Sequence, residues 1–353
     1  MTERRDYSLN GAETQRARER GLVSADWYKC EVPRARMKEL MRRGNFPALW
    51  HLLVWAALII ALGVLAILAW GTWWAAPAFF AYSTILTGSS DARWHECGHG
   101  TAFKSQWINK AVYNFASFFL LREPTVWRWS HARHHTDAII VGRDPEIITP
   151  RPPDFLNLFL TVFNLTGGLK TIRRVFIHAW GKKTFPEEDF VPAPEWPRLF
   201  LAARVWIAIW AAVIVLAIAI GSVLPVLFIL LPPFLGHWLA LFFGVTQHLG
   251  LADDVVDHRL NSRTIHMNPV FRFLYLNMNY HVEHHMFPMV PYHALPALHE
   301  EVKADCPAAY PSTWAAYKEL VPALVRQLRE PDWWVVRDLP VTNRPAAASR
   351  RGA

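Results

Sequence analysis

The sequence predicts an all-α integral membrane protein. We expect four transmembrane helices in two hairpins, with a cytoplasmic helical cap that carries a histidine-rich site for two metal ions. Two of the supporting observations concern charge: residues 44–90 contain no Asp, Glu, Lys or Arg, and neither do residues 205–252. The third observation is a set of three short histidine clusters, all of which lie outside these two runs.

Each charge-free run is long enough for a pair of transmembrane helices. A helix needs about 20 apolar residues to cross a bilayer, and a charge near its centre is costly. Turn-forming residues divide both runs, Gly71 and Pro77 in the first and Gly221 and Pro225 in the second. Two such runs argue against a soluble protein. The predicted spans are residues 48–70, 76–90, 200–220 and 226–247.

The remaining segments are assigned to the cytoplasm. Residues 1–47 are rich in Arg and lack the apolar stretch of a signal peptide, so we expect a cytoplasmic N-terminal leader. Basic residues flank the spans on this side, and with four spans both termini are cytoplasmic. Residues 48–340 then form one membrane domain, and the Ala/Arg-rich tail at 341–353 is expected to be disordered. The net charge of +8 comes without a nucleic-acid-binding motif, so no such partner is expected.

Two further segments carry apolar residues without being full spans. Residues 107–121 are amphipathic, which predicts a helix lying in the membrane interface or an ordinary core helix. Residues 155–176 contain Asn and Gly among apolar residues, which favours an interfacial or re-entrant segment. The three cysteines form no CxxC pair, so neither a cysteine zinc site nor a disulfide framework is predicted.

Half of the 16 histidines fall in three windows, with the sequences HECGH, HARHH and HVEHH. On a helix, positions i, i+3 and i+4 share one face, so the first window presents two imidazoles and the others three each. Imidazoles crowded in this way would partly charge unless a cation binds them as neutral ligands. The clustered histidines are His95, His99, His131, His134, His135, His281, His284 and His285.

The number of imidazoles limits the kind of metal site. A mononuclear zinc site needs three or four ligands, so eight suit two ions better than one. Haem takes single axial histidines, and no CxxCH motif occurs. Two redox-active irons fit the count best, although imidazole also suits copper and zinc. The isolated histidines are expected to be ordinary core or surface groups, namely His51, His178, His258, His293 and His299.

From about His51 to Leu298 the chain resembles the membrane fatty acid desaturase and hydroxylase superfamily. The resemblance rests on the three histidine motifs and on their order relative to the two hairpins. It implies a di-iron centre with the eight clustered histidines as ligands, and a further histidine ligand, for which His248 is the best match and His266 the second. Gly244 occupies a position that is often Asn in acyl-CoA desaturases, and no fused cytochrome b5 domain is visible. The third motif begins with His281 instead of the Gln of front-end desaturases.

The resemblance implies an O₂-dependent oxidoreductase that introduces a double bond into a fatty acyl chain, with hydroxylation of an alkyl, lipid or small-molecule C–H bond as the alternative. The implied partners are a membrane lipid or acyl substrate and a separate electron donor such as ferredoxin or cytochrome b5. A metal or proton transporter and a haem redox subunit are the rival classes. The spans disfavour the transporter because, apart from His237, they carry almost no ionisable groups at their centres.

Acidic residues near the motifs are candidates to orient the ligands, because a ligating imidazole usually donates its other N–H to a carboxylate or carbonyl. Cys97 lies within the first motif but would point away from its histidine face, so packing is favoured over ligation. The acidic candidates are Glu96, Asp137, Asp144, Asp253, Asp254, Asp257 and Glu283.

Overall fold

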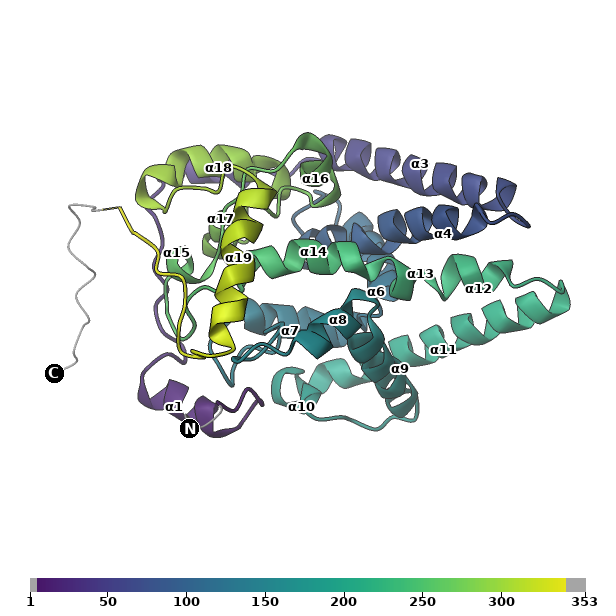
Figure 1. Ribbon diagram of the computed structural model, residues 1–353, viewed down its shortest axis with the longest axis horizontal. Coiled ribbons are helices and arrows are strands. Elements are labelled where there is room, and N and C mark those ends of the chain that lie inside the picture. The colour runs from purple at the N-terminus through teal and green to yellow at the C-terminus, as the bar shows by residue number, and fades with distance from the viewer. Residues whose placement is uncertain (1–4, 341–353) are drawn as a thin grey trace.

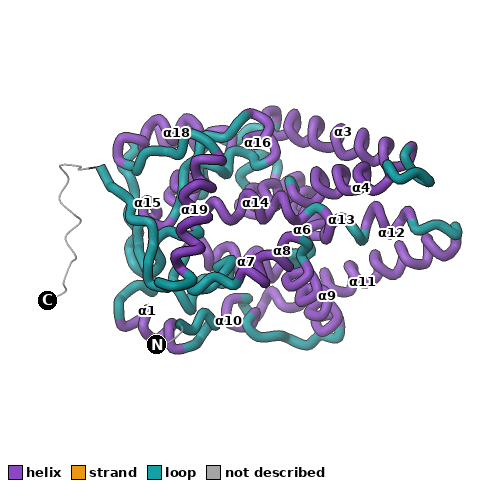
Figure 2. The backbone as a smooth tube through the Cα atoms, viewed as in Figure 1, coloured by secondary structure: helices purple, strands orange, loops and turns teal. Residues whose placement is uncertain are grey.

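The computed structural model describes residues 5–340, and these form helices joined by loops, without a β-strand. The predicted all-α class is therefore confirmed. Figures 1 and 2 show an elongated molecule in which two helical pairs project from one end, while the first and last helices lie at the other. The expected disordered tail at 341–353 lies outside the described residues.

Two helical stretches are long and apolar enough to cross a membrane. They are α3 (Phe46–Leu68) and the stretch Ala193–Ala219, which ends in α11 (Trp196–Ala219). They overlap the predicted spans 48–70 and 200–220, although the second begins before residue 200. Their apolar side chains are largely uncovered; Ile60 of α3 is 66% exposed and Ile218 of α11 is 75% exposed. Apolar surface of this extent requires a lipid or protein environment to cover it.

The other two predicted spans are interrupted helices. In the first hairpin the α-helix gives way to a π-helix, and in the second it stops at Leu230 and again at Gly236. Pro232 and Pro233 explain part of the second break, because proline lacks the N–H that continues a helix. Figure 1 shows α4 beside α3 and α12 beside α11. Four complete spans stay a prediction. The pieces are α4 (Ala75–Ser83), η1 (Thr84–Gly88), α12 (Leu224–Ile229), α13 (Pro232–Leu235) and α14 (His237–His248).

A bent helix pair occupies the segment that was predicted to be interfacial or re-entrant. Helix α8 (Phe155–Val162) meets α9 (Leu165–Ala179) at an angle of 71°. Asn164 forms the corner with a left-handed backbone conformation, φ 52°. The pair is a broken span or a re-entrant loop by length and composition, and would bring the spans to three if it crosses the membrane.

The rest of the chain forms the cap and its supports. The predicted amphipathic helix at 107–121 is α6 (Gln106–Leu120), which packs against α5 (Ser90–His99). Seven further helices, between four and 15 residues long, complete the cap. They are α1 (Ala12–Glu19), α2 (Arg34–Leu40), α10 (Glu187–Phe190), α15 (His258–Asn261), α16 (Pro269–Leu274), α18 (Leu295–Val302) and α19 (Thr313–Gln327).

The N-terminal segment lies on the cap. The Arg5 guanidinium donates to Asp253 at 3.0 Å and also contacts Asp254. The backbone N–H of Tyr28 donates to the Val256 carbonyl at 3.0 Å. A domain boundary at residue 47 stays a prediction, but the residues from Arg5 onward are tied to the loop that follows α14.

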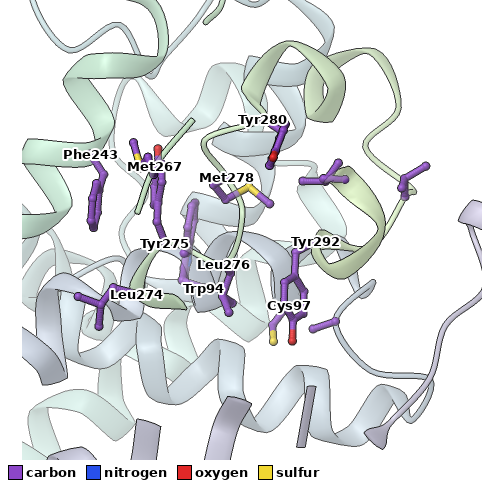
Figure 3. Close-up of a cluster of buried hydrophobic side chains, with 14 of the residues drawn as sticks. Trp94, Cys97, Phe243, Met267, Leu274, Tyr275, Leu276, Met278, Tyr280 and Tyr292 are labelled. Atoms are coloured by element: carbon purple, nitrogen blue, oxygen red, sulfur yellow. The ribbon is translucent and has the colours of Figure 1, made fainter. Parts of the chain in front are cut away.

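A buried apolar core supports the first histidine helix. Figure 3 shows Trp94 and Cys97 from α5 in one cluster with Tyr275 and Met278 from the loop before the third histidine motif. Cys97 is 3% exposed and packs in this core, away from the histidines. Because apolar cores are densely packed, this cluster fixes the position of α5 relative to the third motif.

Candidate metal centre

The first histidine motif lies on α5, which begins directly after the π-helix η1. π-helical turns frequently occur beside functional sites. The Trp55 indole N–H from α3 donates to the Ser89 hydroxyl at 2.7 Å, which ties the start of α5 to the first long helix. His95 is 5% exposed, and His99 is half-buried at the end of the helix. Helix α5 ends at Gly100, whose φ of 69° suits a residue without a Cβ.

The second motif lies on α7 (Pro124–Thr136). The Glu123 side chain caps this helix by accepting hydrogen bonds from the backbone N–H groups of Thr125 and Val126, the latter at 2.7 Å. Pro124 occupies the first turn, where the missing N–H costs nothing. The cap sets the start of α7, and the i, i+3, i+4 spacing then directs His131, His134 and His135 toward one side.

The third motif forms α17 (His281–Met286), all six residues of which are buried. His248 is the last residue of α14 and is also buried. An antiparallel bridge between Thr264 and Tyr280 brings the chain between these helices back to the start of α17. Four helices, separated by up to 190 residues of sequence, therefore deliver histidines to one region.

The structure brings all nine predicted ligand histidines together in two groups. Within each group the candidate ligand atoms lie within 4.8 Å of one another. We call them group A and group B, and no residue is shared. Group A consists of His95, His99, His131, His135 and His284, and group B of His134, His248, His281 and His285.

Short distances between ring nitrogens define each group. In group A, Nε2 of His131 lies 3.2 Å from Nε2 of His95 and 3.2 Å from Nε2 of His99. In group B, Nε2 of His281 lies 3.0 Å from Nε2 of His248. The groups adjoin where the rings of His135 and His285 stack, with centroids 4.5 Å apart. Two ions held in this way would be neighbours.

Three of the nine histidines are oriented by hydrogen bonds from Nδ1. His134 donates to Asp144 at 2.8 Å, and His131 to Glu146 at 3.0 Å. Nδ1 of His248 donates to the Asn261 carbonyl at 2.8 Å. Because carboxylates and carbonyls only accept, the proton of the neutral ring lies on Nδ1 and the lone pair lies on Nε2. These are the acceptors that orient metal-ligating histidines in proteins.

Burial keeps most of these rings neutral. It lowers the pKa of His95, His281 and His284 well below the ordinary value, and the neighbouring imidazoles lower it further. His134 differs: burial opposes its charge, but Asp144 outweighs burial and raises its pKa to about 9. The raised pKa means that Asp144 favours a second proton on His134, at Nε2. A cation bound at Nε2 would take the place of this proton. Neutral imidazole is the form that binds metal.

The donor set fits a pair of imidazole-binding metal ions. Nε2 lone pairs that converge at about 3 Å repel each other unless a cation or a shared proton lies between them. In group B, Nδ1 of both His134 and His248 already holds a proton for its own acceptor, so their Nε2 atoms face the group as acceptors. Four or five nitrogen donors around each position are consistent with a transition metal.

His266, the second choice for the additional ligand, is exposed and belongs to neither group. The seven acidic candidates also differ in the residues that they contact. Among the described contacts, only Asp144 bonds a clustered histidine, whereas Asp257 pairs with Arg259 and Glu283 bonds His299. The sequence reasoning missed Glu146 and the carbonyl of Asn261. The position of Glu146, two residues after Asp144 in the same loop, was the available signal.

A cavity of about 280 Å³ reaches both histidine groups. His95 and His131 of group A and His134 and His248 of group B border it. Its walls combine apolar residues with the partly buried ion pair between Asp91 and Arg122. The apolar part includes Leu120, Leu121, Ile147, Ile148, Ala240, Leu241 and Gly244. A mainly apolar cavity beside candidate metal ligands has the character of a substrate pocket.

The chain belongs to the fatty acid desaturase family. The family model matches residues 72–317, which include all nine histidines of groups A and B. Together with the apolar helices, this membership identifies a membrane protein, as the sequence predicted.

Curated plant proteins resemble shorter parts of the chain. The Delta(12)-fatty-acid desaturase of Arabidopsis thaliana is 34% identical over 120 residues, 33% of this chain and 29% of that protein. A bifunctional fatty acid conjugase/Delta(12)-oleate desaturase of Punica granatum is 32% identical over 117 residues, 33% of this chain and 28% of the relative. The Delta(12) fatty acid dehydrogenase of Crepis alpina is 32% identical over 107 residues, 30% of this chain and 26% of the relative. The chain thus matches less than a third of each relative's length.

Proposed function

We propose that this protein is a membrane-bound, O₂-dependent oxidoreductase that introduces a double bond into a fatty acyl chain with two iron ions as cofactor. The observation that carries the proposal is the convergence of nine histidines in two adjoining groups beside a mainly apolar cavity. The family membership and the desaturase relatives support the choice of reaction and of iron.

The histidines are proposed to act as ligands through Nε2, group A for one ion and group B for the other. Asp144, Glu146 and the Asn261 carbonyl hold three of the rings in the tautomer that leaves Nε2 free. When bound, the two irons would supply the redox chemistry by which O₂ removes hydrogen from an unactivated carbon. The protein's own contribution is to place the substrate and to exclude water.

The cavity gives the chain a means of placing the substrate. Leu120 and Leu121 on one wall and Ile148 on another offer apolar contact to an alkyl chain. His95 and His134 border the same space, so a carbon held against these walls lies beside both ligand groups. Arg122 and Asp91 neutralise each other there, which avoids an isolated charge in an apolar pocket.

Hydroxylation of an alkyl, lipid or small-molecule C–H bond is the alternative outcome of the same chemistry. The two reactions differ in whether a second hydrogen leaves or an oxygen is added to the carbon. The relatives favour desaturation, because the three described above bear desaturase or dehydrogenase names. A metal transporter is disfavoured because the histidines of groups A and B lie outside the two helical stretches that are long and apolar enough to cross a membrane, Phe46–Leu68 and Ala193–Ala219.

The topology and partners complete the proposal. Four spans in two hairpins place both termini and the cap in the cytoplasm, with α4 and the α12–α14 segment as the interrupted spans. The substrate reaches the cavity from the membrane. A separate carrier, such as ferredoxin or cytochrome b5, supplies electrons on the cytoplasmic side.

Expression in a host of known lipid composition tests the function. Lipids from cells that express the protein and from cells that express the His284→Ala variant are compared by mass spectrometry. We expect a product that is two mass units lighter than a host acyl chain, present only with the unaltered protein. A product sixteen units heavier identifies the hydroxylase alternative. Equal lipid profiles, with both proteins present in the membrane and the unaltered protein loaded with iron, would contradict both.

A further inference from the structure

Three aromatic rings lead from the protein surface to group B. The indole of Trp27 stacks on the imidazole of His258, with centroids 4.2 Å apart and planes 7° apart. His258 lies in turn 4.9 Å from the ring of His285, a member of group B. His258 is 2% exposed, whereas Trp27 is half-buried and reaches the surface. Neither residue belongs to a ligand group.

Hydrogen bonds fix the position of Trp27. Its indole N–H donates at 3.0 Å to the carbonyl of Thr136, the residue that follows His135. The next residue, Tyr28, donates its backbone N–H to Val256, and the guanidinium of Arg259 lies 3.5 Å from the centre of the Tyr28 ring. Contacts with the residue after the second histidine motif and with the start of α15 therefore fix the position of the stack.

We propose that Trp27 and His258 form the route by which electrons enter the metal centre from a carrier protein, an inference that rests on the proposed function. Electronic coupling falls steeply with the width of the gap between donor and acceptor, and the stacked rings fill the gap between surface and ligand. Each passage oxidises the reduced carrier by one electron and reduces one ferric ion to ferrous. No bond forms or breaks, and no proton has to move.

The surface around Trp27 suits an acidic carrier. Trp27 packs in one apolar cluster with Ala17 of α1 and with Leu22, so it lies against this segment of the chain. Figure 1 shows α1 and α15 at the end of the molecule away from α3 and α11, where a soluble protein can approach. Opposite charge accelerates such encounters. The exposed charged residues between 12 and 29 are four basic and two acidic ones, Arg16, Arg18, Glu19, Arg20, Asp26 and Lys29, and of the basic ones Arg16 pairs with Glu13 and Arg20 with Asp254.

Anaerobic stopped-flow reduction of the iron-loaded, purified protein tests the route. A reduced [2Fe–2S] ferredoxin serves as the carrier, and dithionite serves as a small reductant that needs no docking surface. We compare Trp27→Leu, Trp27→Phe and the control Trp107→Leu, which alters an indole that is 72% exposed on α6. Iron content and the unfolding temperature are measured for each variant.

We expect Trp27→Leu to lose most of its reduction rate with ferredoxin while keeping its rate with dithionite, its iron and its unfolding temperature. Trp27→Phe should retain much of the ferredoxin rate, and Trp107→Leu all of it. Added salt should slow the ferredoxin reaction alone. An unchanged ferredoxin rate in Trp27→Leu, or a parallel loss of iron and of the dithionite rate, would overturn the route. A wild-type protein that dithionite reduces but ferredoxin does not would overturn the acidic carrier. Failure of the wild-type protein to hold iron would instead overturn the proposed function.

Discussion

His134 and Asp144 form a buried hydrogen bond of 2.8 Å from the imidazole Nδ1 to a carboxylate oxygen, and the same oxygen accepts the backbone N–H of Ile139 at 2.8 Å. The second bond fixes the carboxylate, and the first fixes the ring. The position of the His134 ring in group B therefore depends on Asp144 and on the loop after α7 that carries it. Glu146 has the same role for His131 in group A, and it also accepts the hydroxyl proton of Ser130.

This division predicts that the two sites can be weakened separately. Asp144→Asn should lower the affinity of group B for its ion by about 10- to 100-fold, the usual effect of losing such a partner. Glu146→Gln should do the same for group A. Iron retained per chain during titration with a chelator is the measurement, and each variant should lose one ion early and the other as the wild type does. The surface variant Glu300→Gln is the control; simultaneous loss of both ions in either variant would contradict separate sites.

His248 and His266 provide a second prediction, because both were candidates for the additional ligand. His248 lies in group B, with Nε2 3.0 Å from that of His281, whereas His266 is exposed beside His299. His248→Ala should lower the iron content toward one ion per chain and abolish product formation, because group B loses one of its four nitrogen donors. His266→Ala should leave both properties unchanged. Elemental analysis and product yield are the measurements, and the reverse pattern would exclude His248 as a ligand.

The histidine sites could be predicted from sequence because helical spacing is local. The i, i+3, i+4 pattern places His131, His134 and His135 on one face wherever the helix lies. The spacing does not say which ring goes to which ion, and the structure separates His134 from its two neighbours in the motif. That separation depends on the positions of α14 and α17, which no local pattern encodes.

Other features could not be predicted from local sequence patterns for the same reason. The carbonyl of Asn261 meets His248 across 13 residues and carries no side-chain signal. His258 was expected to be an ordinary core or surface group, because an isolated histidine usually is. Only the folded chain brings it between Trp27 and His285. Both long apolar helices lie where spans were predicted, α3 within two residues at each end and α11 with a start at Trp196 instead of residue 200, whereas the break before Pro232 divided a segment whose hydropathy looked continuous.

Removal of the metal should destabilise the protein. Without a cation, the clustered nitrogens of each group face one another with uncompensated lone pairs, and a ligand that binds only the folded state stabilises it by mass action. Prolonged chelation should lower the unfolding temperature in detergent, and added ferrous iron should restore it. The triple substitution of His134, His248 and His281 by Ala is the control and should respond less to both treatments. An unfolding temperature that is independent of metal would contradict a resident ion pair.

The four-span arrangement predicts which residues are accessible from outside the cell. Thr72 lies in the turn between α3 and α4, and Ser222 in the turn between α11 and α12, at the end of the molecule opposite α19. A membrane-impermeant maleimide should label Thr72→Cys and Ser222→Cys in intact cells, but Arg329→Cys only after the cells are opened. The background should be low because Cys30, Cys97 and Cys306 are all buried. Labelling of only one of the two turns in intact cells would require an odd number of spans between them.

The cavity wall at Gly244 predicts how substrate size can be changed without disturbing the metal. A Cβ added at Gly244 would lie 3.7 Å from Cδ1 of Ile148, an ordinary contact, so Gly244→Ala should fold normally and keep its iron. In the helix interior alanine is favoured over glycine by about 1 kcal/mol. Gly244→Phe projects a ring into the space beside His248 and should exclude long chains while both ions remain bound. Product yield is measured with acyl chains of increasing length. The chain length at which the yield falls should therefore be shorter for Gly244→Phe than for Gly244→Ala. If the Phe variant keeps its iron and accepts the same chains as the wild type, the substrate must reach the histidines by another path.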